Sequence, residues 1–161
     1  MATTITVRLP RDVAERLSKE ARKLGLGLEE YILELALRES DPSERARAYI
    51  ETAKELLERS REELERGDIR QAAEKAWGAA ALAVKAYVEW SEGRRLLSHG
   101  ELWEAMRRMV SELGAWVRDS WMYANGMHTC FYEGWCSRED VEEALKRIRR
   151  LVDEVATRIK P

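Results

Sequence analysis

The sequence contains few of the residues on which disulfide-rich, zinc-binding and membrane-spanning proteins depend. Its 161 residues include two cysteines, three prolines, one phenylalanine, one glutamine and one asparagine. Two cysteines cannot build a disulfide framework or a four-cysteine zinc site. No apolar run is long enough to span a bilayer, and the N-terminus has no basic region followed by an apolar run. We therefore expect a cytoplasmic protein with no membrane partner.

The scarcity of amides indicates the kind of organism that the protein comes from, and the low number of cysteines limits their possible roles. Abundant Glu, Arg and Lys with few amides is the balance associated with thermophile proteins. For Cys130 and Cys136 we expect two semi-buried thiols. A disulfide is the alternative, because intracellular proteins of hyperthermophiles do form them.

Charge is nearly balanced over the whole chain but uneven along it. The net charge is −2, with 45% hydrophobic and 36% charged residues, so a sizeable core is expected and a general affinity for nucleic acid is not. Residues 1–26 carry six basic and three acidic side chains, a net charge of +3. Residues 27–41 carry one basic and five acidic side chains, a net charge of −4.

The stretch from Gly67 to Trp90 predicts a central buried helix. Asp68 and Gln71 have the spacing of a capping box, and apolar or small residues follow on every side. One side of this helix carries most of its polar residues, with Lys75 beside them: Gln71, Glu74 and Lys85. Two readings stay open, since these side chains either reach solvent at the rim or line a polar pocket.

The chain has three distinctive segments: residues 67–86, residues 98–103 (Ser-His-Gly-Glu-Leu-Trp) and residues 127–135, which include Met-His and Phe-Tyr-Glu-Gly-Trp. Together they resemble the archaeal PaREP family (Pyrobaculum aerophilum repetitive family one), a member of the HEPN superfamily of helical bundles. The resemblance extends roughly from Pro42 to the C-terminus. It implies an antiparallel helical bundle and a homodimer, and it implies no particular reaction.

Residues 1–41, which we call the leader, have a different pattern. Ile5, Val7 and Leu9 alternate with polar residues, which predicts a short strand, and two amphipathic helices follow. This order resembles a ribbon-helix-helix domain, in which two chains pair their strands into a ribbon that reads DNA bases. The resemblance implies that the outward, nucleic-acid-binding side chains are Thr4, Thr6 and Arg8. Against it, Gly27, Glu29 and Glu30 stand where that family holds a DNA phosphate.

Two histidines are the main candidates for chemistry in the rest of the chain. HEPN ribonucleases use an Arg and a His separated by four to six residues, and the resemblance aligns His128 with that His. No Arg stands at the matching positions, and nine residues separate Arg118 from His128. The ribonuclease motif is therefore broken, and a hydrogen-bonded core histidine is the simpler reading. By analogy with the superfamily, a candidate ligand cleft would gather seven residues: Glu74, Lys75, Lys85, His99, His128, Tyr132 and Glu133.

No zinc spacing and no phosphate-binding glycine loop are present in the sequence, so we assign no metal and no cofactor. The predicted fold is all-α, a HEPN-like bundle over residues 42–161, preceded by the leader with its short strand. The first functional hypothesis is a non-catalytic homodimer that binds DNA through the leader, in a regulatory or toxin–antitoxin-like role. The alternatives are a nucleotide-binding protein or ribonuclease with a cleft around His128, and a purely structural oligomer.

Overall fold

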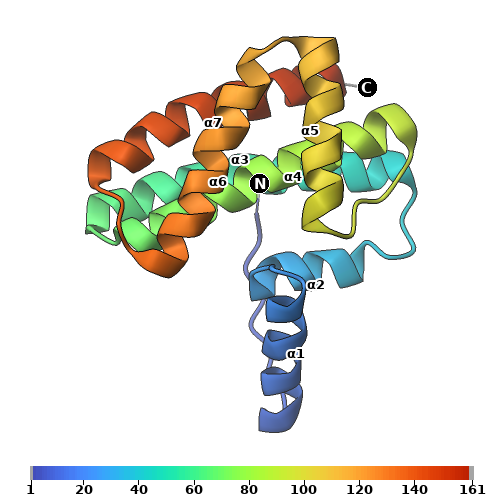
Figure 1. Cartoon of the computed structure of the whole chain (residues 1–161). Helices are drawn as coiled ribbons and strands as arrows, with labels where there is room; N and C mark the ends of the chain where they lie inside the picture. The colour runs from blue at the N-terminus through green and yellow to red at the C-terminus, as the bar shows by residue number, and fades with distance from the viewer. Residues whose placement is uncertain (1, 160–161) are drawn as a thin grey trace.

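The computed structural model describes residues 2–159, and this part of the chain contains seven helices and no strand. In chain order the helices are α1 (Arg11–Lys23), α2 (Leu28–Ala36), α3 (Pro42–Arg66), α4 (Ile69–Glu92), α5 (His99–Leu113), α6 (Trp116–Glu133) and α7 (Arg138–Ile159). Helices α3 to α7 form a bundle, whereas α1 and α2 lie at one side of it (Figure 1). The all-α prediction is confirmed.

Helix α4 lies at the centre of the bundle, as its all-round apolar pattern predicts. It packs against α3, α5, α6 and α7, and every residue from Ala76 to Glu89 is buried. The turn between α3 and α4 is short because Gly67 adopts a left-handed conformation, with φ of 84°, and the Asp68 side chain accepts the backbone N–H of Gln71. The two longest helices therefore run antiparallel and in close contact.

Capping side chains set the start of two other bundle helices. Asp41 accepts the N–H of Glu44 at the start of α3, where Pro42 occupies the first turn. Ser98 and Glu101 form the capping box predicted at the start of α5. This box places His99 in the first turn of α5.

The predicted N-terminal strand is not formed in the described chain. Residues 2–10 have no regular secondary structure, and Ile5 and Val7 are 80% and 68% exposed. A strand requires a second strand for its backbone hydrogen bonds, and no other described segment of this chain offers one. Helix α1 packs against α2 and projects away from the bundle (Figure 1).

The two cysteines form a disulfide, so the expectation of two free thiols is wrong. Cys130 lies in the last turn of α6, and Gly134 turns the chain back after that helix with φ of 71°. This turn brings the Cα of Cys136 within 5.7 Å of the Cα of Cys130, a separation that a disulfide spans.

Among residues 2–159, no helix is both long and apolar enough to cross a membrane.

Candidate functional site

A cavity of about 810 Å³ lies between the leader and the bundle. Its walls come from the end of α1, from α2, α4, α5 and α6, and from the segment that joins α4 to α5. The acidic, basic and histidine side chains that line it are Lys23, Glu30, Glu34, Arg38, Lys85, Arg95, His99 and His128. Four of these are lysine or arginine and two are glutamate, so basic side chains outnumber acidic ones in the lining.

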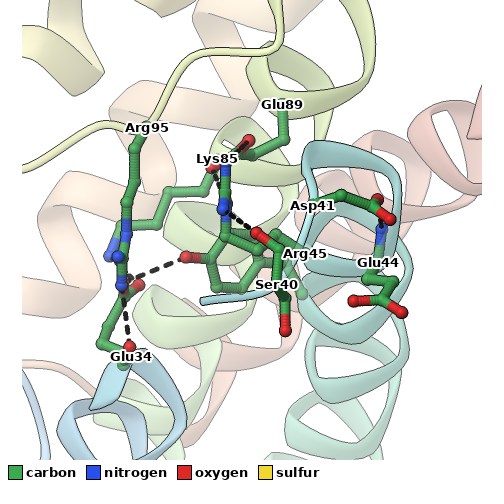
Figure 2. Close-up of polar contacts among 9 residues, drawn as sticks. Glu34, Ser40, Asp41, Glu44, Arg45, Lys85, Glu89 and Arg95 are labelled. Carbon is green, nitrogen blue, oxygen red and sulfur yellow. Dashed lines mark hydrogen bonds and ion pairs between the residues drawn. The ribbon is translucent and has the colours of Figure 1, made fainter. Parts of the chain in front are cut away.

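One side of the cavity contains a buried cluster around the carboxylate of Glu34. Lys85 Nζ lies 3.0 Å from one carboxylate oxygen of Glu34, and Arg95 Nη2 lies 2.7 Å from the other. The hydroxyl of Tyr49 donates to the second oxygen at 3.0 Å. The side chains of Glu34 and Lys85 are only 11% and 8% exposed. This cluster joins α2 to α3, α4 and the α4–α5 segment, as Figure 2 shows for Glu34, Lys85 and Arg95.

The donors around Glu34 keep its side chain ionised in spite of burial. Burial alone would raise the pKa of Glu34, but the positive charge of Lys85 and the hydrogen bond from Arg95 outweigh it and leave the pKa lowered. Burial and the charge of Glu34 raise the pKa of Tyr49, so its hydroxyl stays protonated and donates. Glu34 is therefore a carboxylate held by three donors.

A second buried ion pair lies beside this cluster (Figure 2). Arg45 Nε and Nη2 donate to the two carboxylate oxygens of Glu89 at 2.7 and 3.0 Å. Arg45 also donates to the backbone carbonyl of Ser40, at the end of the leader. The Glu89 side chain is 1% exposed, so this pair is withdrawn from water.

The two histidines also line the cavity. The ring centroids of His99 and His128 are 5.9 Å apart, and that of Trp77 lies 4.6 Å from that of His128. Trp103 Nε1 donates to His99 Nε2 at 3.0 Å, which places the proton of a neutral His99 on Nδ1. Burial, and then the nearby His99, lower the pKa of His128. Of the residues predicted for a ligand cleft, Lys85, His99 and His128 line this cavity.

The other predicted cleft residues lie outside this cavity. Lys75 Nζ lies 3.7 Å from a carboxylate oxygen of Glu63 on α3, and it donates a hydrogen bond to the side chain of Gln71. Glu74 lies near Gly27 at the start of α2, and burial raises its pKa. The rings of Tyr132 and His128 are nearly perpendicular, with centroids 5.3 Å apart, but Tyr132 is mostly exposed. Glu133 is exposed at the end of α6.

Sequence reasoning missed Glu34, Tyr49 and Arg95. A signal for Glu34 was present, because a lysine within a helix that is apolar on every side requires a buried anion. Glu30 and Glu34 are one helical turn apart on α2, on the side away from Ile32 and Leu35. Gly78 on α4 admits this side of α2, since a Cβ at Gly78 would lie 2.7 Å from Glu30 Oε1.

The predicted DNA-reading residues, Thr4, Thr6 and Arg8, are all exposed in the extended segment before α1. None of the three lines the cavity, and they form no hydrogen bond or ion pair within residues 2–159. Their environment in the single chain is solvent.

The fold and the cavity define a helical-bundle protein with a pocket between the bundle and an N-terminal helical leader. Within that class, the chain belongs to the archaeal PaREP1/PaREP8 family, whose model matches residues 48–152. A crystal structure of a Sulfolobus solfataricus protein is similar, with a TM-score of 0.60 and 24% identity over 68% of this chain and 97% of that one. This likeness shows the fold alone. The search of curated proteins found no significant match.

Proposed function

We propose that the protein is a homodimeric regulatory protein that pairs through its leader and contacts DNA with the resulting ribbon. One observation carries the proposal. Among residues 2–159, fourteen large hydrophobic residues are exposed, and eight of them lie between Ile5 and Leu35. The eight are Ile5, Val7, Leu9, Val13, Leu24, Leu28, Ile32 and Leu35. Such a concentration in a short segment is typical of an interaction surface.

A second copy of the leader is the occupant that fits this surface best. Ile5, Val7 and Leu9 point to one side of an extended segment, and an antiparallel mate would supply the missing backbone partners. Burying each of the sixteen side chains in a dimer contributes on the order of 1 kcal/mol, since each is already partly covered. That sum is comparable with or larger than the association cost of about 4–15 kcal/mol.

In such a ribbon, Thr4, Thr6 and Arg8 of both chains would share the exposed face. An arginine can donate two hydrogen bonds to guanine, and a threonine methyl can contact that of thymine. The first turn of α2 offers no phosphate site, because Glu29 and Glu30 are acidic and Glu29 pairs with Arg59 at 2.7 Å. DNA binding should therefore be weak and steeply dependent on salt.

The oligomeric state is tested by light scattering at micromolar concentration. Wild type should have twice the 18.7 kDa mass of one chain. Val7→Lys should give a monomer, because it places a charge in the paired ribbon. Met122→Lys is the matched control, since Met122 is 54% exposed on α6, and it should remain dimeric. A monomeric wild type contradicts the proposal.

DNA contact is tested by fluorescence anisotropy with mixed-sequence duplexes at about 50 mM salt. Arg8→Ala should weaken binding markedly, whereas Arg61→Ala, on the exposed surface of α3, should change it little. Glu29→Ser should strengthen binding by removing a carboxylate from a helix N-terminus. If the protein is dimeric but Arg8→Ala binds like wild type, the leader is a structural dimerisation segment.

The HEPN-like assignment of the bundle belongs to the same proposal. It is supported by the antiparallel helices and by the position of His128 beside His99. A ribonuclease is the weaker alternative, because Arg118 would lie about 15 Å along α6 from His128. Ligand binding in the cavity is the second candidate, favoured by its volume of about 810 Å³ and its cationic lining.

A further inference from the structure

We propose that the bundle contains a binding site for a phosphate group, built from Tyr49, Lys85 and Arg95, and that Glu34 of α2 fills this site as an internal competitor. The inference is independent of the proposed DNA contact. It rests on the convergence of three donors from α3, α4 and the α4–α5 segment on one carboxylate of the leader.

All three donors of the site belong to the bundle, and the acceptor alone belongs to the leader. Lys85 Nζ, Arg95 Nη2 and Tyr49 Oη each lie within 3.0 Å of a Glu34 carboxylate oxygen. Lys85 and Tyr49 are buried, on neighbouring helices that are locked together in the core. Lys85 and Tyr49 would therefore keep their places if α2 moved away, so two of the three donors are preformed. Both hydrogen bonds of Arg95 go to Glu34, so its guanidinium would be free to bind another anion.

The balance of charge favours a dianion over the carboxylate now bound. Lys85 and Arg95 bring two positive charges, and Glu34 brings one negative charge. The neighbouring Arg45 and Glu89 neutralise each other. A phosphate dianion in place of Glu34 would balance the charges of Lys85 and Arg95, and its additional oxygens would accept more hydrogen bonds than a carboxylate can. Glu30 also lines the cavity, but burial raises its pKa to about 7, so at neutral pH it carries only part of a negative charge.

The cluster also contains a hydrogen-bond donor that Glu34 does not use. Arg95 Nε is buried and has no hydrogen-bond partner among residues 2–159. A guanidinium that already uses Nη2 can turn its Nε edge toward a tetrahedral anion. Buried polar nitrogens without partners are rare in native proteins, so this one is consistent with an acceptor that the single chain does not supply.

The site can be reached from solvent. Lys85 and Arg95 both line the cavity of about 810 Å³, together with the exposed Arg38 and Ser98. Arg38 lines the cavity and forms no ion pair within the described part of the chain, so its charge is available to an anion. The cavity has room for the rest of a phosphomonoester as well as for inorganic phosphate.

Replacement of Glu34 would loosen α2 from the bundle. Glu34 is the buried anchor of this helix, whereas the Glu29–Arg59 pair is largely exposed and stabilises little. Phosphate binding and docking of the leader are therefore mutually exclusive at this point. Each should weaken the other by the same factor.

The test is isothermal titration with inorganic phosphate and, separately, with ethyl phosphate, at matched ionic strength in chloride. Glu34→Gln should bind phosphate at least tenfold more tightly than wild type, because the competing charge is gone. Glu29→Gln, on the same helix, is the matched control and should leave the affinity as in wild type. Tighter binding of ethyl phosphate than of inorganic phosphate would identify a phosphomonoester as the ligand.

Two further variants separate a specific site from a general attraction of charge. Adding Lys85→Met to Glu34→Gln should abolish binding, and Tyr49→Phe in the wild-type chain should lower the affinity several-fold with the fold intact. Hydrogen exchange of the α2 amides in wild type should become faster when phosphate is added. The proposal is overturned if Glu34→Gln and wild type bind equally, or if neither binds phosphate at millimolar concentrations.

Discussion

Replacing Glu89 by alanine removes the carboxylate that neutralises Arg45 inside the bundle. The Glu89 side chain is 1% exposed and that of Arg45 is 11% exposed, and two hydrogen bonds of 2.7 and 3.0 Å join them. Truncation leaves a guanidinium charge with little access to water. Breaking a buried pair in this way costs about 3–5 kcal/mol.

This loss is large relative to the stability of the whole domain, which is about 5–15 kcal/mol for typical proteins. In a chain of this size, each kcal/mol lowers the melting temperature by about 2–4 °C, so Glu89→Ala should lower it by about 6–20 °C. The free energy of unfolding is measured by urea denaturation followed by circular dichroism.

Two controls show whether the cost comes from the stranded charge. Glu51→Ala breaks the exposed Lys54–Glu51 pair and should cost about 0–1 kcal/mol. The double variant Arg45→Met with Glu89→Leu removes both charges and should be more stable than Glu89→Ala alone. If Glu89→Ala lies within about 1 kcal/mol of wild type, the pair is not withdrawn from water and the reasoning fails.

Three further predictions concern protonation and the disulfide. Burial, and then His99, lower the pKa of His128 below 6.5, so the unfolded chain binds a proton at this residue before the folded chain does, and the contribution of His128 to stability is lost as pH falls through about 6.5. His128→Ala should lower the free energy of unfolding by about 1–3 kcal/mol and should remove this pH-dependent loss, as measured by urea titrations. Burial raises the pKa of Glu30 to about 7, so the contribution of Glu30 to stability is present below about pH 4.5 and is lost as pH rises toward 7. The same titrations should show that Glu30→Gln removes this loss of stability and is more stable than wild type above pH 7. Cys136→Ser opens a short loop closed by the disulfide to Cys130 and should cost about 2 kcal/mol in thermal melts, with no further loss on adding a reductant.

The sequence predicts the helices well where local chemistry sets their ends. Asp41, Asp68 and Ser98 start helices through their own side chains, and Gly67 ends one by adopting a conformation that other residues avoid. These are contacts over a few residues, and the spacing of residue types along the chain reveals them.

The features that were missed depend on distant or absent partners. A strand at Ile5 and Val7 needs backbone from outside the described chain, so alternation alone could not decide it. Pairing of Glu34 with Lys85 depends on the register in which α2 meets α4, which no local pattern encodes. The disulfide depends on the turn at Gly134, which brings Cys136 back to α6.

The continuous burial of α4 also restricts how its sequence can diverge. On an ordinary surface helix, a one-residue insertion can be absorbed on the solvent side. In α4, an insertion near Gly78 would rotate everything after it by about 100°. Lys85 would lose Glu34 and Glu89 would lose Arg45, while each small residue would meet a different neighbour. We therefore expect α4 to keep a constant length among homologues, with insertions and deletions confined to the segments between helices, such as that between Gly93 and Ser98.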